Sequence, residues 1–359
     1  MELKTARMNT VAVSSEAITA VLDSFRYGKS FLQTEISALV GVSDMTVSRA
    51  SRYLRRAGVL DVREEVDSGG VNKRHTVYPR DISSLLVIDL SGDVFRAVLM
   101  DTSLNILMSA EHIYNNIFDF EDNLRVLLNE AYRIGLIDTW KDREVVHSLP
   151  YDLNRKERMR RSRAKRVAKL VARMKTCFRP LVRLGVVMPN EHTLSALRTC
   201  APDSELIRRC VEDTLGREVD ASLSPKDAFL LGAPSVIASG ASVATLANAR
   251  SMLLFGNGSP FGDQPFSVFL CRKGARAPWV LPDGTMGRLA YAPLRTDVPP
   301  KRNVARIIGY FTPDVVGYEK DFRVQTDGEV IVTSHRATLL GAGIALRDSA
   351  WKEYVRFAE

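Results

Sequence analysis

Residues 33–58 have the sequence QTEISALVGVSDMTVSRASRYLRRAG, a pattern typical of two short helices that cross at a tight turn. Ser37 is small where such helices approach each other, Gly41 frees the backbone for the turn, and Ser43 can cap the second helix. The apolar residues fall where both helices must bury side chains, namely Ile36, Val40, Val42, Val47 and Ala50. The stretch therefore predicts a helix-turn-helix, and an ordinary helical hairpin inside a core is the alternative.

The second helix of this pair has one outward face, because the helical period fixes the opposite side once the buried positions are assigned. The residues that share this face are Ser43, Asp44, Met45, Ser48, Arg49 and Arg52. We interpret them as candidates for reading base edges in a DNA major groove, with Arg49 and Arg52 recognising guanine. The alternative is a solvated helix face that recognises nothing.

The flanking residues complete a small domain around these helices. A helix is expected before the helix-turn-helix, at residues 14–27. Two strands joined by a turn are expected after it, at Val59–Val66 and His75–Tyr78. We interpret the strands as a wing, and Lys73 and Arg74 at its tip are candidates for contacts to DNA phosphates. Arg26 and Lys29 are further candidates for such contacts. An exposed hairpin with chance charges is the alternative interpretation of the wing.

Length and composition set limits on the class of protein. A chain of 359 residues suggests two or three domains, and its composition is that of a soluble globular protein. The chain has no apolar run long enough to span a bilayer, and its N-terminus lacks a signal-peptide pattern, so we expect a cytoplasmic protein without membrane contact. The cysteines lack Cys-x-x-Cys spacing, which favours buried free thiols over a zinc site or disulfides: Cys177, Cys200, Cys210 and Cys271.

The net charge of +8 is concentrated in one segment. Residues 1–80 hold 12 Lys+Arg against 9 Asp+Glu, whereas residues 151–185 hold 13 against 2. Apolar residues recur at helical spacing within this basic segment (residues 155–183), so a long amphipathic helix is expected there. A solvated face packed on the body, an auxiliary contact to the DNA backbone, and a patch for an acidic partner or anionic ligand all remain open.

A second region begins after Pro79. Its first elements are expected to be three strands and a helix, at Leu85–Leu90, Val94–Asp101, Leu104–Ala110 and Glu121–Arg133. A winged helix-turn-helix that runs directly into LLVIDLSGDVFRAVLMD (residues 85–101) resembles the ROK family, which contains repressors and sugar kinases. Later segments resemble family segments in the same order, including DTLGREVDASLSPKDAFLLGA, SMLLFGNGSPFG, GRLAYAPL and ATLLGAGIAL.

The resemblance implies the fold class and the domain organisation. An α/β protein is expected, with an N-terminal winged helix-turn-helix domain at residues 1–80 and a two-lobed actin/hexokinase-like (ribonuclease H-like) domain at residues 81–359. The first lobe would contain residues from about 81 to 205 together with the C-terminal helix. The second lobe would contain residues from about 206 to 335.

The resemblance also locates the residues expected for sugar phosphorylation, and several of them are replaced. The position of the catalytic aspartate corresponds to Pro225, which has no acid-base group. Asp227 lies two residues along, but even a small displacement of a catalytic group is costly. Arg288 and Tyr291 stand where the family has a sugar-binding glutamate and a metal-binding histidine, and the family's cysteine-rich zinc segment is missing.

The first phosphate loop departs from the family as well. Ser91 and Asp93 stand where Gly and Thr are usual, and Asp93 would bring a negative charge close to bound phosphates. We therefore expect no catalytic residues, no metal and no cofactor. The residues that could still line a ligand cleft between the lobes are Asp89, Ser91, Gly92, Asp227, Gly256, Gly258, Arg288 and Tyr291.

These observations lead to one preferred hypothesis and two competitors. The preferred hypothesis is a transcriptional regulator, expected to be a repressor, that binds a double-stranded DNA operator as a homodimer, with a catalytically inactive sugar-kinase-like domain (a pseudokinase) open to a sugar or another small-molecule effector. The first competitor is an active sugar kinase with an appended DNA-binding domain, in which Asp89 and Asp227 carry the catalysis. The second is a ligand-independent scaffold protein that binds DNA nonspecifically through the basic segment.

Overall fold

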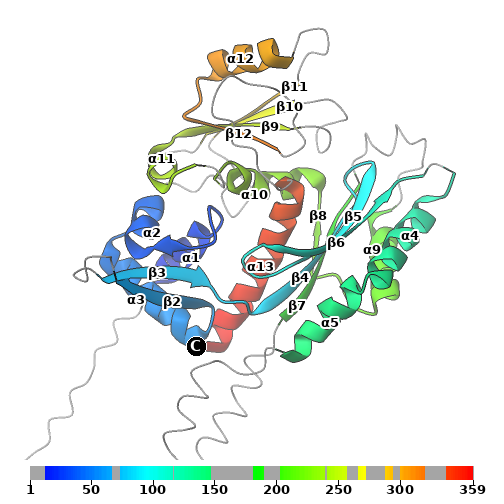
Figure 1. Cartoon of the computed structure of the whole chain (residues 1–359), viewed down its shortest axis with the longest axis horizontal. Helices are drawn as coiled ribbons and strands as arrows, with labels where there is room; N and C mark the ends of the chain where they lie inside the picture. Colours follow the sequence, from blue (N-terminus) through cyan, green and yellow to red (C-terminus); the bar gives the residue numbers. More distant parts are fainter. Residues whose placement is uncertain are drawn as a thin grey trace, which may run out of the picture.

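The structure, a computed structural model, describes residues 13–66, 73–115, 117–146, 181–189, 203–238, 241–256, 266–271, 288–293, 300–319 and 337–358. The described residues form a mixed α/β protein with a small N-terminal unit and a larger body of two sheets (Figure 1). The helix expected within the basic segment, over residues 155–178, lies outside the described residues, as does Gly258.

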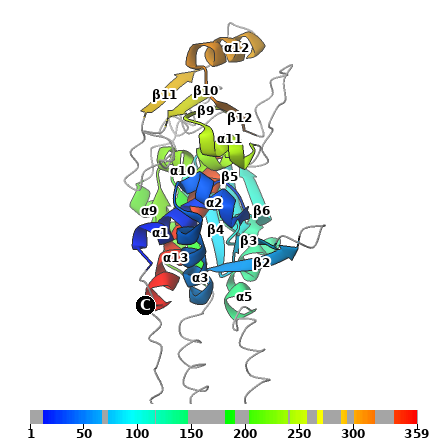
Figure 2. The same ribbon diagram turned by 90° about the vertical axis from the view of Figure 1, so that its left-hand side faces the viewer.

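The N-terminal unit combines three helices with a small antiparallel sheet of strand order β1-β3-β2. Its elements are α1 (Ser15–Ser24), β1 (Phe31–Leu32), α2 (Gln33–Val40), α3 (Asp44–Ala57), β2 (Leu60–Val66) and β3 (Lys73–Pro79). The predicted helices and hairpin strands are thereby confirmed. Val21, Ile36, Val47 and Leu54 are each 0% exposed, so all three helices contribute to one core. The β2–β3 hairpin projects from the body (Figure 2).

The first sheet of the body has the strand order β6-β5-β4-β7-β8, in which β7 and β8 run parallel to β4. Its elements and the helices on one face are β4 (Ser83–Asp89), β5 (Val94–Met100), β6 (Ile106–Ile113), α4 (Phe120–Arg133), α5 (Leu136–Val146), β7 (Leu181–Val187), α9 (Ser204–Leu215) and β8 (Ala221–Leu223). Leu86 and Ile88 of β4 pack toward the side of α4, α5 and α9, whereas Leu85 and Val87 pack toward α13 (Ala337–Ala358). The continuous apolar run predicted for this strand is explained by burial on both faces.

The second sheet has the strand order β11-β10-β9-β12. Its elements and helices are α10 (Pro225–Ala238), α11 (Val243–Asn248), β9 (Ser251–Gly256), β10 (Phe266–Cys271), β11 (Arg288–Pro293), α12 (Pro300–Phe311) and β12 (Val315–Tyr318). Met252 and Leu254 face the core that contains α10, whereas Leu253 and Phe255 face α12. The two sheets follow one plan, because each has an antiparallel three-strand meander whose first strand pairs with a parallel strand.

The first sheet takes in more of the chain than the boundary expected near residue 205. Helix α9 packs in the core beneath this sheet, and β8 pairs with β7 through the register Gly185↔Ala221. The chain therefore leaves the first sheet only after residue 223. The expected division into domains and lobes otherwise stays a prediction.

Helices α10 and α13 pack closely between the two sheets (Figure 1). A Cβ atom at Gly232 would lie 1.8 Å from the Ala337 carbonyl oxygen, and one at Gly341 would lie 1.7 Å from the Ala228 carbonyl oxygen. Only glycine permits such close approach of the two backbones. The N-terminal unit packs on the same region, since α3 contacts α13 and α2 contacts α11.

Candidate nucleic-acid interface

The turn between α2 and α3 is fixed by the three small residues that the sequence singled out. Gly41 ends α2 in the left-handed conformation with φ of 73°, and the Ser37 hydroxyl donates a 2.6 Å hydrogen bond to the Val42 carbonyl. The Ser43 hydroxyl accepts a hydrogen bond from the Thr46 backbone N–H at 3.2 Å and so caps α3. These contacts set the angle at which α3 leaves the turn.

Helix α3 has one buried and one exposed face. Val47, Ala50 and Leu54 are each 0% exposed and anchor the helix in the unit's core. The opposite side carries the residues predicted to read bases, of which only Ser48 is half-buried and the others are exposed: Ser43, Asp44, Met45, Ser48, Arg49 and Arg52. Met45 has 64% of its surface exposed.

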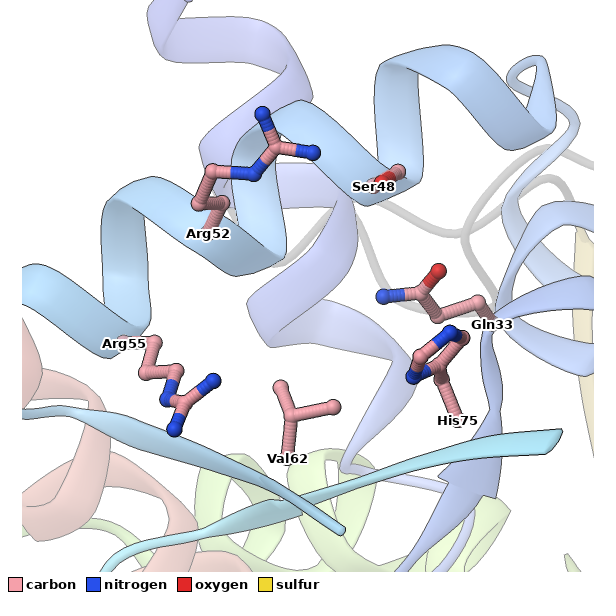
Figure 3. A pocket seen from close by; sticks show the side chains of 6 residues that line it. All are labelled: Gln33, Ser48, Arg52, Arg55, Val62 and His75. Atoms are coloured by element: carbon pink, nitrogen blue, oxygen red, sulfur yellow. The ribbon is translucent and has the colours of Figure 1, made fainter. Parts of the chain in front are cut away.

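A groove separates α3 from the hairpin and has a volume of about 180 Å³. Its lining comes from α2, α3, β2 and β3, and consists of Gln33, Ser48, Arg52, Arg55, Val62 and His75 (Figure 3). Arg55 also lies 3.9 Å from Asp61 in an exposed ion pair. The sequence-based prediction missed Gln33, Arg55 and His75. Spacing along α3 could have identified Arg55, which is one turn beyond Arg52, but the other two are brought in by tertiary packing.

The hairpin presents different residues on its two faces. Val62 lines the groove, whereas its neighbour Arg63 stacks on the Tyr78 ring at 4.6 Å and donates to the Tyr78 hydroxyl at 3.1 Å. The backbones of Lys73 and Arg74 begin β3 and pair with Val66 and Glu65. The side chains of Lys73 and Arg74 lie outside the described residues, so their proposed phosphate contacts stay a prediction.

Arg26 does not occupy the position expected for a phosphate contact. Its guanidinium lies 2.8 Å from the Asp348 carboxylate and 3.2 Å from Asp23, and its side chain is only 17% exposed. Burial works against the charge of Arg26, but attraction to Asp348 and Asp23 outweighs burial and raises the pKa of Arg26. Lys29 donates to the Asn105 side chain of the body. Arg26 therefore joins the N-terminal unit to the body instead of facing outward, whereas Lys29 makes its contact to the body at an exposed position.

The contact between the N-terminal unit and α13 is centred on two large buried side chains. Trp351 meets the Phe25 ring edge-on at 6.2 Å, and the Arg347 guanidinium lies 4.3 Å from the Trp351 ring. Arg347 also donates to the Phe25 carbonyl at 3.1 Å, and its burial lowers its pKa. Burial has the opposite effect on an acid and raises the pKa of Asp23, and the positive charge of Arg26 offsets this rise only in part. Apolar and charged contacts together fix the unit on the helix that also packs on the first sheet.

In the body, Asp89 is buried and engaged in hydrogen bonds. Its carboxylate accepts from the Ser91 hydroxyl at 2.6 Å, from the Ser91 backbone N–H at 3.0 Å and from the Thr338 hydroxyl at 3.3 Å. Glu319, also buried, accepts from the Ala337 backbone N–H at 3.0 Å. Two carboxylates of the chain itself thus lie at the N-terminus of α13, a position that would otherwise favour a bound anion.

Asp227, Gly92 and Gly256 are further residues that were predicted to line a ligand cleft. Asp227 is exposed and accepts a 2.7 Å hydrogen bond from the Ser224 hydroxyl, which in turn accepts from the Asp227 backbone N–H at 3.1 Å. This exchange is a helix-capping arrangement at the start of α10. Gly92 is half-buried at the β4–β5 hairpin and Gly256 ends β9. The structure brings Asp89 and Ser91 together but gives no contact between them and Asp227.

Arg288 and Tyr291 lie on β11, where their backbones pair with Cys271 and Val268. Their side chains lie outside the described residues. Cys210 and Cys271, the two cysteines in the described part, are half-buried, and burial raises the pKa of the Cys210 thiol. Among the described residues no group of His, Cys, Asp and Glu could hold a metal ion. None of the described helices combines the length and apolar character needed to cross a bilayer.

No protein-family model matches this sequence, and no curated protein matches it. Among solved structures, a ROK family transcriptional regulator, described as a homologue of the E. coli MLC protein, is similar with 8% identity and a TM-score of 0.42, over 96% of this chain and 98% of that one. The Aquifex aeolicus Ppx/GppA phosphatase (14% identity, TM-score 0.29, 67% and 68% covered) and YeaZ from Pseudomonas aeruginosa (14%, 0.28, 75% and 92%) are also similar. These similarities are distant.

Proposed function

We propose that the protein is a sequence-specific DNA-binding transcriptional regulator whose N-terminal unit is a winged helix-turn-helix. The observation that carries this proposal is the two-sided character of α3, with Val47, Ala50 and Leu54 fully buried while Met45, Arg49 and Arg52 are exposed. A capped helix held in this way can present side chains to the major groove while the adjacent hairpin meets the phosphate backbone.

Arg49 is the main candidate for base recognition. Its guanidinium can donate two hydrogen bonds to the O6 and N7 atoms of guanine, which is the commonest specific contact in the major groove. The exposed Met45 lies one turn before Arg49 and offers an apolar contact for a thymine methyl group. Asp44, in the first turn of α3, is expected to lie away from the DNA phosphates, because its carboxylate and the phosphates are both negatively charged and repel each other. Arg52 lies between this surface and the groove beside the hairpin.

For the body we propose a two-lobed, actin-like scaffold that has lost phosphotransfer. The repeated strand order of the two sheets supports the two-lobed arrangement. Asp93 in the first phosphate loop supports the loss of catalysis, since it would bring a negative charge close to bound phosphates. The resemblance noted in the sequence adds Pro225 at the position of the family's catalytic base.

A homodimer and control by a small molecule complete the proposal. A single helix-turn-helix reads only a few base pairs, whereas a two-fold pair reads a palindrome with half-sites about one helical turn apart. A sugar or another metabolite bound between the lobes would regulate DNA binding only if it had different affinities for two arrangements of the protein. Light scattering at DNA-binding concentrations tests the dimer, and a monomeric mass would contradict it.

Mapping genomic binding sites by crosslinking and sequencing tests the proposed regulator directly. We expect a limited set of sharp sites upstream of genes, and an operator derived from them should outcompete random duplex at the same salt concentration. Even coverage of the genome, or equal affinity for both duplexes, would instead support the nonspecific scaffold protein.

The alternative function is an active sugar kinase with an appended DNA-binding domain. The observation that favours it is the exposed carboxylate of Asp227 at the start of α10, which is accessible to a substrate hydroxyl. Turnover of Mg-ATP with a panel of hexoses separates the two functions. Hexose-dependent turnover that is lost in Asp227→Asn would establish the kinase, whereas we expect no turnover above that of buffer.

A further inference from the structure

The groove between α3 and the hairpin has the wrong size and lining for a metabolite. Its volume of about 180 Å³ is below the range of about 300–1,000 Å³ that is usual for small-molecule sites. Such sites are mostly apolar, whereas Val62 is the only apolar residue among the six that line this groove. The remaining five offer hydrogen-bond donors, and two of them, Arg52 and Arg55, are guanidinium groups.

The donors come from separate parts of the chain and line one groove, in which the guanidinium groups of Arg52 and Arg55 point to opposite sides (Figure 3). Ser48, Arg52 and Arg55 are spaced four and three residues apart, so they form one stripe along the side of α3 that faces the hairpin. Gln33 approaches from the start of α2, and His75 from β3 on the opposite wall. A small anion with several acceptor oxygens could receive hydrogen bonds from two or more walls at once.

We propose that this groove binds one backbone phosphate of the DNA duplex, with Arg52 and Arg55 supplying the positive charge and Gln33, Ser48 and His75 supplying hydrogen bonds. The inference rests on the proposed function, because it takes the duplex as the partner. When α3 lies in the major groove of the DNA and the hairpin lies beside α3, the sugar-phosphate strand that borders the major groove must pass between α3 and the hairpin. The protein groove lined by Arg52 and Arg55 lies between these same two elements.

This inference gives Arg52 and Arg49 different tasks. Arg49 is not among the residues that line the groove, whereas Arg52 is. Loss of Arg52 should therefore weaken binding to all sequences alike, and loss of Arg49 should relax the choice of base. Phosphate binding in the groove would also fix the rotation of α3 about its axis, which determines where Arg49 meets the base pairs.

The test is a double-mutant cycle between the protein and single phosphates. A duplex is first selected with the full-length wild-type chain and is then prepared with one uncharged methylphosphonate at each backbone position in turn. At the position that lies in the groove, neutralisation should weaken wild-type binding about tenfold, as expected for one charge-assisted hydrogen bond. The same neutralisation should cost Arg55→Gln clearly less than tenfold, because Arg52 alone then supplies the positive charge, and it should cost a protein with both Arg52→Gln and Arg55→Gln almost nothing. Arg55→Gln should also reduce the slope of log K against log salt, by at most about 0.9.

Arg56→Gln is the matched control, because Arg56 is the next residue on α3, is also exposed, and does not line the groove. It should keep the full tenfold sensitivity at the groove position. If the effects of Arg55→Gln and of phosphate neutralisation were additive at every position, the groove would not bind a phosphate, although the protein would still bind DNA. If Arg52→Gln altered the base preference, Arg52 would be a base-reading residue. If wild-type protein bound no duplex, the proposed function itself would fail.

Discussion

Replacement of Trp351 by alanine tests whether the N-terminal unit is held on the body through α13. Trp351 is 1% exposed and lies between the Phe25 ring, 6.2 Å away, and the Arg347 guanidinium, 4.3 Å away. Removal of a buried tryptophan side chain costs about 3–5 kcal/mol, which includes the lost contacts and the cavity that remains. Since about 1.4 kcal/mol corresponds to a factor of ten, release of the unit should become roughly a hundredfold to several thousandfold more frequent.

Hydrogen exchange followed by mass spectrometry measures this release segment by segment. In Trp351→Ala, peptides from residues 15–57 should exchange faster by about that factor, while peptides from β4 and β5 keep their protection. Trp351→Phe is the control, because it retains a ring beside Phe25 and Arg347 and removes an Nε1–H that has no hydrogen-bond partner within the described part of the chain. Equal acceleration in both variants, or acceleration confined to α13, would refute the reasoning.

Two further perturbations have predictable signs. Burial raises the pKa of Asp23, so the folded protein binds this proton more tightly than the unfolded chain, and the stabilisation present at low pH is lost as the pH rises through the raised pKa. Asp23→Asn should flatten that fall in urea unfolding midpoints as the pH rises above about 4, and parallel curves for the two proteins would contradict it. Gly232→Ala should destabilise the protein by about 3 kcal/mol or more, because the new Cβ would lie 1.8 Å from the Ala337 carbonyl oxygen. Gly309→Ala is the control, because it lies at a helical position with no atom within 4 Å of the new Cβ, and it should instead stabilise the protein by about 0.5–1 kcal/mol. Similar melting temperatures for Gly232→Ala and Gly309→Ala would exclude the proposed steric clash.

Local sequence patterns were sufficient for much of the N-terminal unit and the first sheet. Ser37, Gly41 and Ser43 act within a few residues of themselves, so their types alone indicated the turn and the start of α3. The exposed face of α3 follows from helical periodicity for the same reason. The unbroken apolar run of β4 likewise indicated a strand that is buried on both faces.

The missed features depend on contacts between distant parts of the chain. Arg26 had the appearance of a surface phosphate ligand, but its partner Asp348 lies 322 residues away, and no local pattern links them. His75 and Gln33 line the same groove as Arg52 because β3 and the start of α2 pack beside α3. Asp89 was identified as a cleft residue, yet its burial and its bond to Thr338 depend on where the C-terminal helix packs. A single sequence does not contain these pairings in readable form.

Selection from a randomised duplex library, performed in parallel with wild-type protein and Arg49→Ala, tests most directly whether the outward surface of α3 reads bases. The wild-type protein is predicted to enrich a two-fold symmetric motif that contains a guanine in each half-site. Arg49→Ala should lose discrimination at that guanine, which corresponds to about 1–3 kcal/mol, and should keep the preferences at other positions. Recovery of the same motif with undiminished guanine preference from Arg49→Ala, or of no motif from the wild-type protein, would contradict the account.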